Sequence, residues 1–135
     1  YQQSAAYLRS LGDTTDYQFS AEVFLRDSFG DNAAFATMVA VEDEQILGYL
    51  IYHFTYDTDR AIRILYVLDL LVDSEVRGKG IGTALMDDAN RIAKEKVATE
   101  LQWVVYIHNR QAMDFYQKWG GELIEDILHM RRTVS

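Results

Sequence analysis

The sequence of 135 residues contains no cysteine and no proline, and it contains only three histidines. The lack of cysteine excludes disulfides, thiolate nucleophiles and cysteine metal sites, and it is typical of a cytoplasmic protein. No apolar run approaches 18 residues and no stretch resembles a signal peptide, so we expect no membrane span and no membrane partner. His53, His108 and His129 lie far apart and lack carboxylates at metal-ligand spacing, so we predict no metal site.

Positive charge is scarce in the first part of the chain. Residues 1–75 hold 4 of the 13 Lys and Arg but 13 of the 21 acids, whereas residues 76–135 are close to neutral. The acidic part repels a polyanion such as DNA, so we predict no nucleic-acid partner, and it can attract a small cation. Taken alone, an acidic surface more often serves solubility.

The length of 135 residues, with 49% hydrophobic and 25% charged residues, predicts one folded domain spanning residues 1–135. Helical spacing, glycine stops and β-rich runs divide the chain into successive elements. We expect, in order, a helix at 1–12, a helix at 20–30, a hairpin of strands at 34–42 and 45–55, a central strand at 62–72, a helix at 81–97, a strand at 101–107, a helix at 109–121 and a β region at 122–132. This order predicts an α/β fold with a mixed central sheet, antiparallel in its N-terminal part and βαβα in its C-terminal part, with helices on both faces.

Three of the eight glycines lie within the seven residues VRGKGIG, Val76–Gly82. This loop joins the expected central strand to the long helix, and Arg77 and Lys79 alternate with its glycines. A helix N-terminus carries unpaired N–H groups and partial positive charge, so a glycine turn before it can surround a phosphate. A plain flexible connection is the alternative, since short glycine motifs often match by chance. The loop closes with Ile81-Gly82-Thr83, so it fits neither a P-loop nor a dinucleotide fingerprint.

The spacing Arg77-x-x-Gly80-x-Gly82 resembles the glycine loop of the GNAT acyl-CoA-dependent N-acetyltransferases. Two further pieces occur in the same order as in that family: an apolar strand end at Leu70–Val72, and a pattern N-x-x-A-x-x-F-Y from Asn109 to Tyr116. The segments DSFG, HFTYD and LDLLV look like the spermidine/spermine (diamine) N-acetyltransferase branch. The first strand, which the family places before its first helix, is not evident in this sequence.

The resemblance implies that the loop and the helix N-terminus after it bind the pyrophosphate of coenzyme A, while the strand end pairs with the pantetheine arm. Asn109 is expected to hydrogen-bond the pantetheine arm or the loop. The resemblance also implies acetyl-CoA as cosubstrate and a homodimer. The implied cofactor-binding residues are Leu70, Leu71, Val72, Arg77, Gly78, Lys79, Gly80, Ile81, Gly82, Thr83, Asn109, Ala112 and Tyr116.

Acetyl transfer to an amine requires a neutral amine, hydrogen-bond donors for the tetrahedral oxyanion and a proton for the departing thiolate. The resemblance implies Tyr116 as the general acid, for which packing in the last helix is the alternative role. The strand backbone at Leu71–Val72 is a candidate for the oxyanion donors.

The base is where this chain departs from the polyamine branch, which usually has Glu-Asp at the position of Leu68-Asp69. Asp69 could hold the amine or order a water that removes its proton; the alternative is a buried aspartate tied to a backbone N–H. Asp57 matches a family acid thought to face the polyamine, and its alternative is an ordinary loop residue. We therefore expect Tyr116 and Asp69 to be catalytic, and Asp57 and Asp69 to bind substrate.

Together these patterns predict an acetyl-CoA-dependent N-acetyltransferase whose partner is a small-molecule primary amine, such as a di- or polyamine. Amino acids, aminoglycosides and protein amines are the alternative acceptors. A CoA-binding module without catalysis is the alternative class of protein. Tyr116 argues against such a module, and Leu68 slightly favours it.

Overall fold

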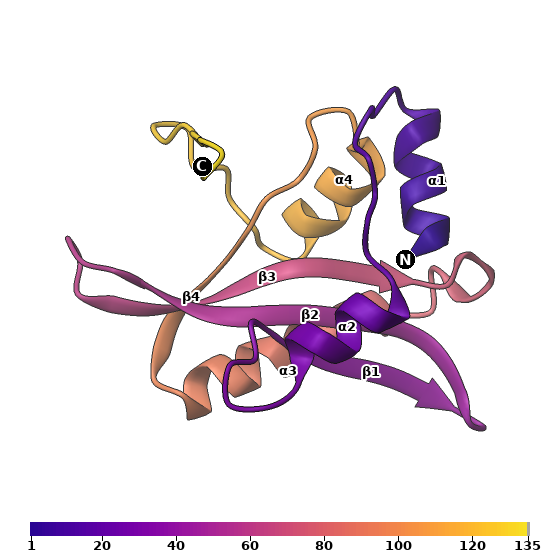
Figure 1. The fold of residues 1–135 in the computed structure, drawn as a ribbon, viewed down its shortest axis with the longest axis horizontal. Coiled ribbons are helices and arrows are strands. Elements are labelled where there is room, and N and C mark those ends of the chain that lie inside the picture. The colour runs from indigo at the N-terminus through magenta and orange to yellow at the C-terminus, as the bar shows by residue number, and fades with distance from the viewer. Residues whose placement is uncertain (135) are drawn as a thin grey trace.

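The computed structural model describes residues 1–134, apart from the side chains of Gln3 and Ser4. Figure 1 shows its helices and strands in chain order. These elements are α1 (Gln2–Ser10), α2 (Ala21–Ser28), β1 (Ala36–Glu42), β2 (Gln45–Asp57), β3 (Ile62–Val72), the short 3-10 helix η1 (Ser74–Val76), α3 (Ile81–Glu95), β4 (Ala98–Trp103) and α4 (Arg110–Lys118). The first helices form as expected: Ser20 Oγ accepts the Val23 N–H at the start of α2, and Gly12 follows α1 with a φ of +93°.

The four strands form one mixed sheet in the order β1-β2-β3-β4. The pairs β1–β2 and β2–β3 are antiparallel, whereas β3 and β4 are parallel and are joined through α3. Asp43 and Glu44, both at positive φ, turn the β1–β2 hairpin at the acidic break in the sequence. The predicted fold class is therefore confirmed: an antiparallel start, a βαβα end, and helices on both faces of the sheet (Figure 1).

The central strand β3 and the edge strand β4 stay paired over only part of their length. Their register runs from Arg63 opposite Ala98 to Val67 opposite Trp103, whereas β3 continues beside β2 as far as Val72. The residue after Val67 is a β-bulge, because Tyr52 of β2 faces Val67 and its neighbour Ile51 faces Asp69. Among the residues that the structure describes, the last part of β3, 68–72, thus has a strand partner on the β2 side and none on the β4 side.

The main core lies between the sheet and α3, which contacts all four strands and crosses behind β1 and β2 in Figure 1. Helical spacing places the apolar residues of α3 on one stripe, and these residues pack against alternate residues of the strands. The buried cluster consists of Leu50, Leu65, Val67, Leu85, Met86, Ala89, Ala93 and Ala98.

The opposite face of the sheet is covered by the N-terminal helices. Aromatic rings form a connected chain there, with Tyr1, Phe19 and Phe24 packed edge to face or tilted against one another. Figure 1 shows α1 next to α4, and the end of α1 lines a small hollow together with Asn109 at the start of α4. Helices α1 and α4, the first and the last of the chain, therefore lie together beside residues 68–72 of β3.

Two strand predictions differ from the structure. The strand expected at 101–107 runs instead from Ala98 to Trp103, because its ladder with β3 ends at the bulge and leaves Val104–Ile107 without a partner. The β region expected at 122–132 forms no strand within residues 1–134. Figure 1 shows this yellow C-terminal segment apart from the sheet. A β-prone sequence needs a partner strand, and this segment has none here.

Candidate functional site

The glycine loop between β3 and α3 is shaped by its backbone. Gly78 and Gly80 have φ angles of +79° and +83°, in the left-handed region where a Cβ is strained. Gly80 is the N-cap residue of α3 and has no side chain with which to cap it. The first N–H groups of the helix, from Ile81 to Thr83, therefore lack the usual side-chain acceptor. They can donate hydrogen bonds to a bound anion instead.

The two cations of the loop are exposed beside this helix N-terminus. Arg77 is held in place because its Nε donates a hydrogen bond of 3.1 Å to the carbonyl oxygen of Val72, the last residue of β3. Lys79 lies between the two left-handed glycines. The loop thus combines positive charge with open N–H groups at the end of the strand, as expected for an anion site.

Gly82 brings the glycine loop and α4 into contact. A Cβ on Gly82 would stand 3.2 Å from Cζ of Phe115 and 3.6 Å from Cγ2 of Val72. The aromatic ring of α4 therefore packs directly on the backbone of α3, where a side chain would displace it. This contact gives a physical reason for glycine and phenylalanine in two motifs that are 33 residues apart.

Asn109 begins α4, and its Oδ1 accepts the backbone N–H of Ala112 at 3.2 Å. The structure thus uses the asparagine as a helix cap, which explains its three-residue spacing from Ala112. Its expected hydrogen bond to the pantetheine arm or the loop stays a prediction. The cap orients the first turn of α4 and, with it, the residues one and two turns later.

Tyr116 is largely buried between aromatic neighbours. Its ring centroid lies 5.0 Å from that of Trp103, at the end of β4, and 5.3 Å from that of Phe115. Burial, followed by the negative charge of Asp69, raises the pKa of Tyr116 to about 12. The phenol therefore keeps its proton at neutral pH and can donate it, as a general acid must.

Asp69 follows the β-bulge on β3 and points to the face covered by the N-terminal helices. Its Oδ2 accepts a hydrogen bond of 2.8 Å from Oη of Tyr49. Burial raises the pKa of the Asp69 carboxyl, against the opposing effects of the Tyr49 hydrogen bond, the amino group of Tyr1 and the Leu70 N–H. A carboxyl with a raised pKa is a better proton acceptor than an exposed aspartate.

The structure brings Asp69 and Tyr116 into electrostatic contact, but it places Asp57 elsewhere. Asp57 ends β2 six residues beyond Ile51, the partner of Asp69, which corresponds to about 20 Å along the strand. Its Oδ2 accepts from Nε of Arg60 at 2.7 Å, and this ion pair lowers the pKa of Asp57. Its expected contact with substrate stays a prediction.

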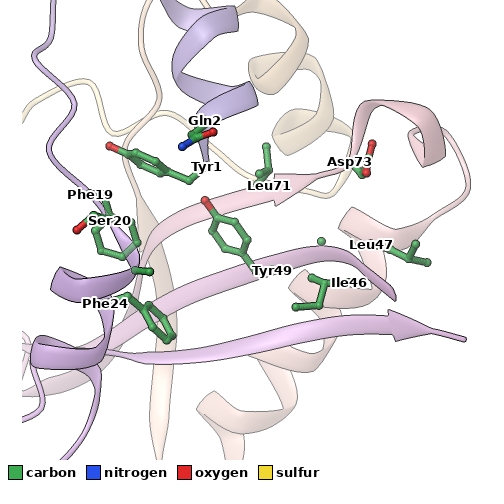
Figure 2. Close-up of a pocket in the computed structure, with 12 residues that line it drawn as sticks. Tyr1, Gln2, Phe19, Ser20, Phe24, Ile46, Leu47, Tyr49, Leu71 and Asp73 are labelled. Carbon is green, nitrogen blue, oxygen red and sulfur yellow. The ribbon is translucent and has the colours of Figure 1, made fainter. Parts of the chain in front are cut away.

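A cavity of about 500 Å³ opens between α1, α2, the start of β2 and the end of β3 (Figure 2). Asp69 does not line it, but Tyr49, which does, donates the hydrogen bond to Asp69. Aromatic side chains and the backbone of Gly48 and Leu71 form much of its wall. The Tyr49 side chain projects from β2 into this space, between Tyr1 and Leu71 (Figure 2). Tyr49 was not predicted from the sequence, since its only signal is a place on the strand beside Asp69, which depends on the bulge.

Two other kinds of feature, a metal site and a membrane span, are absent from the described part of the chain. Within residues 1–134, no group of three or more His, Cys, Asp or Glu side chains is close enough to hold a metal ion. None of the helices in the same part of the chain has the length and apolar character needed to cross a membrane.

Comparison with known proteins gives a family match. The profile of the acetyltransferase (GNAT) family matches residues 4–121, which include the glycine loop, Asp69 and Tyr116. A thialysine N-epsilon-acetyltransferase of Bos taurus is 28% identical over 130 residues, covering 85% of this chain and 76% of that protein. Spermidine/spermine N(1)-acetyltransferase-like protein 1 of Homo sapiens is 31% identical over 111 residues, covering 77% of this chain and 16% of that protein.

A similar solved structure is the integron cassette protein VCH_CASS6 from the mobile metagenome of V. cholerae. It superposes with a TM-score of 0.74 at 28% sequence identity, and the match covers 85% of this chain and 74% of that one. The mixed sheet with its flanking helices is therefore an arrangement that this chain shares with known structures.

Proposed function

We propose, from the premise that this chain belongs to the acetyltransferase (GNAT) family, that it moves an acetyl group from acetyl-CoA to a primary amine of a small molecule. The observation that carries the proposal is the unpaired end of β3 beside the uncapped N-terminus of α3. The strand end offers backbone groups to an extended arm, and the helix end offers N–H groups to a diphosphate. We also propose a cytoplasmic location, which the absence of cysteine supports.

The residues near these two features fit the proposed donor. In the proposal, the backbone of Leu70, Leu71 and Val72 pairs with the pantetheine arm, and the loop from Arg77 to Thr83 binds the pyrophosphate. The side-chain oxygen of Asn109 caps α4, so the side-chain nitrogen Nδ2 can donate the hydrogen bond to the pantetheine arm or the loop. Gly80, where nothing lies within 4 Å of an added Cβ, keeps the helix N-terminus open to a close approach of the ligand.

The proposed reaction needs few groups. The amine nitrogen forms a bond to the acyl carbon, the carbon–sulfur bond breaks, and the thiolate takes a proton from Tyr116. Asp69 holds the incoming ammonium and accepts its proton directly or through a water, so that the neutral amine attacks. The nitrogen loses its second proton as the amide forms; this proton returns to the Tyr116 phenolate directly or through water, and the proton that Asp69 has accepted passes to solvent. The raised pKa of Tyr116 keeps the phenol protonated until the thiolate forms, and the raised pKa of Asp69 supports its role as an acceptor.

A di- or polyamine is the acceptor that we favour. The first 75 residues hold 13 of the 21 acids, which attracts cations, and the cavity lined by Tyr49 has aromatic walls that suit an ammonium group. Relatives are named for thialysine and for spermidine or spermine, so amino acids remain a second candidate class. Aminoglycosides and protein amines are the further alternatives.

A CoA-binding module without catalysis is the competing function. The specific observation in its favour is Leu68, 46% exposed on the bulge, at the position where the polyamine branch usually has an ionisable side chain. The protonated Tyr116 close to Asp69 supports catalysis instead.

The experiment that separates these functions measures thiol release from acetyl-CoA with a panel that includes putrescine, spermidine, lysine, thialysine and an aminoglycoside. We expect turnover that depends on the amine and yields the N-acetylated product by mass spectrometry. Calorimetric titration with CoA provides the matched binding measurement. CoA binding without turnover on any amine would establish the module, and the absence of CoA binding would reject both functions.

We further propose that the protein is a homodimer. The C-terminal segment exposes several large apolar side chains, namely Leu123, Ile124, Ile127, Leu128 and Met130, and such exposure is typical of a surface that another chain covers. Sedimentation equilibrium tests the proposal, with the quadruple substitution of Leu123, Ile127, Leu128 and Met130 by serine as the variant. We expect a dimer for the native chain and a monomer for the variant; a native monomer would contradict the proposal.

A further inference from the structure

We propose that Tyr49 is a positioning residue for acyl transfer, and that its hydroxyl fixes the orientation and the ionisation of Asp69. This inference rests on the proposed function, because it concerns the acid that meets the amine. Tyr49 is on β2 and lies outside the sequence motifs by which the family resemblance is identified.

The β-bulge at Leu68 is the feature that creates the contact. Side chains alternate between the two faces of a strand, and Val67 points into the α3 core. Without the extra residue, this alternation would turn Asp69 to the apolar face, where Leu65 and Val67 are buried. The bulge turns Asp69 instead to the face that carries Tyr49, its diagonal neighbour on β2.

The hydrogen bond engages one oxygen of the carboxylate. Tyr49 Oη donates to Asp69 Oδ2 at 2.8 Å, and none of the side chains that the structure describes bonds to Oδ1. A phenol has a single hydrogen to donate, so the second oxygen stays free to accept from an amine or a water. The tyrosine ring is itself packed in the wall of the 500 Å³ cavity, which limits the directions that Asp69 can take (Figure 2).

The groups that face Asp69 come from three elements besides its own strand. They are Tyr49 from β2, the phenol and the amino group of Tyr1 at the start of α1, and Tyr116 from α4. Burial raises the pKa of Asp69, and the Tyr49 hydrogen bond is the largest opposing influence. Tyr49 therefore keeps the carboxylate ionised over a wider pH range, so that it can hold a cationic amine before it accepts a proton.

Leu68 makes this tuning important in the present chain. The residue beside Asp69 carries no ionisable group, so one carboxyl must both attract the amine and remove its proton. The neighbouring acid at the end of β3, Asp73, accepts the Glu75 N–H at 3.0 Å in the turn after the strand. Because Leu68 cannot ionise and Asp73 is engaged in the turn, both tasks fall to Asp69. The hydrogen bond from Tyr49 therefore affects both the attraction of the amine and the removal of its proton.

The kinetic test compares Tyr49→Phe with the native chain on the best acceptor of the amine panel. Loss of one hydrogen bond to a carboxylate should move the acidic limb of the kcat/KM profile to higher pH by about one pH unit. The variant should therefore be about tenfold less active on that limb and close to the native chain above it. Tyr66→Phe is the matched control: it removes a phenol on the same face that makes no hydrogen bond within residues 1–134, and its profile should not shift.

A second measurement does not require activity. The carboxyl ¹³C signal of Asp69, assigned by its loss in Asp69→Asn, is titrated in the unliganded native chain and in both tyrosine variants. We expect a higher pKa in Tyr49→Phe and an unchanged one in Tyr66→Phe. An unchanged Asp69 titration in Tyr49→Phe, or a loss of activity that is uniform across pH, overturns the positioning role. A native chain that acetylates no amine but shows the expected titration overturns the proposed function alone.

Discussion

The two halves of β3 differ in how many strands they pair with and in what their side chains contact. From Ile64 to Val67 the strand has a partner on each side and contributes side chains to the α3 core, where Leu65 is completely buried. From Leu68 to Val72 it has a partner on one side only, and it carries the half-buried acid Asp69 and leads into the glycine loop. One residue, the bulge at Leu68, separates the two halves.

This difference shows how the chain obtains a rigid support and an open backbone from one strand. The paired half fixes the position of the strand through packing and two ladders of hydrogen bonds. The other half leaves polar backbone groups and an acid where a ligand can reach them, which stabilises the folded chain less. Substitutions in the first half should therefore change stability, and substitutions in the second half should change activity.

The largest expected effect is that of Tyr116→Phe, which removes the proposed proton donor near residues 68–72 of β3, the half with one strand partner. We expect kcat to fall by about 10²- to 10⁴-fold, because general acids contribute rate factors of that size. CoA affinity measured by calorimetry should stay within about twofold of the native value, since the packed ring is retained. A variant with native kcat would remove Tyr116 from the mechanism.

Leu65→Ala tests the paired half. It creates a cavity in the main core, so the free energy of unfolding should fall by about 3 kcal/mol in urea denaturation. The control is Leu68→Ala on the bulge, where the side chain is 46% exposed and the loss should be below about 1 kcal/mol. Equal losses at both positions would contradict the division of β3 into two halves.

Gly82→Ala tests the contact between the glycine loop and α4. The added Cβ would meet Phe115 at 3.2 Å, so the ring and the start of α4 must shift by a few tenths of an ångström. Because reactions are sensitive to such misplacement, we expect kcat/KM to fall by about tenfold. The double variant Gly82→Ala, Phe115→Leu makes room for the new methyl group and should recover part of the loss, which steady-state kinetics would show.

Asp69→Asn measures what this half-buried acid contributes to stability. Its folded pKa is raised by burial, so the folded state binds a proton more tightly than the unfolded state. That contribution is fully present below the pKa of the unfolded chain and is lost as the pH rises through the folded pKa. The variant should therefore gain in urea midpoint, relative to the native chain, as the pH rises to neutral. A difference that does not change with pH would contradict the raised pKa.

The smallest effect is expected at Asp57, about 20 Å from Asp69 along the sheet. Asp57 is already held by Arg60, which also pairs with Glu100, so it acts on a cationic substrate mainly through its long-range field. We expect Asp57→Asn to lower kcat/KM for a diamine less than about threefold, and only at low ionic strength. A large rise in KM that persists in high salt would show direct contact instead.

Much of the fold could be predicted from local patterns. Helix α3 follows from the helical spacing of Ile81, Leu85, Ala89, Ile92 and Ala93. Ser20 caps α2, as its place before an apolar run indicates. The tight acidic break between the first two strands also forms a hairpin. The glycine loop could be located because left-handed backbone angles at Gly78 and Gly80 need glycine.

The remaining features depend on pairing between distant parts of the chain. The bulge at Leu68 leaves no mark in the apolar run IRILYVLDLLV, yet it decides where β4 ends and on which face Asp69 lies. The partnership of Tyr49 with Asp69 follows only once that register is known. The β-prone C-terminal segment shows the same limit, because its composition predicts a strand but cannot supply the partner.

The open end of β3 and the bare start of α3 present main-chain atoms, which every residue type provides. Recognition of this kind constrains the path of the backbone and leaves most side chains free to vary. Proteins with such a frame can therefore diverge widely in sequence while they retain one activated donor, and they can change their acceptor by replacing the few residues around one cavity.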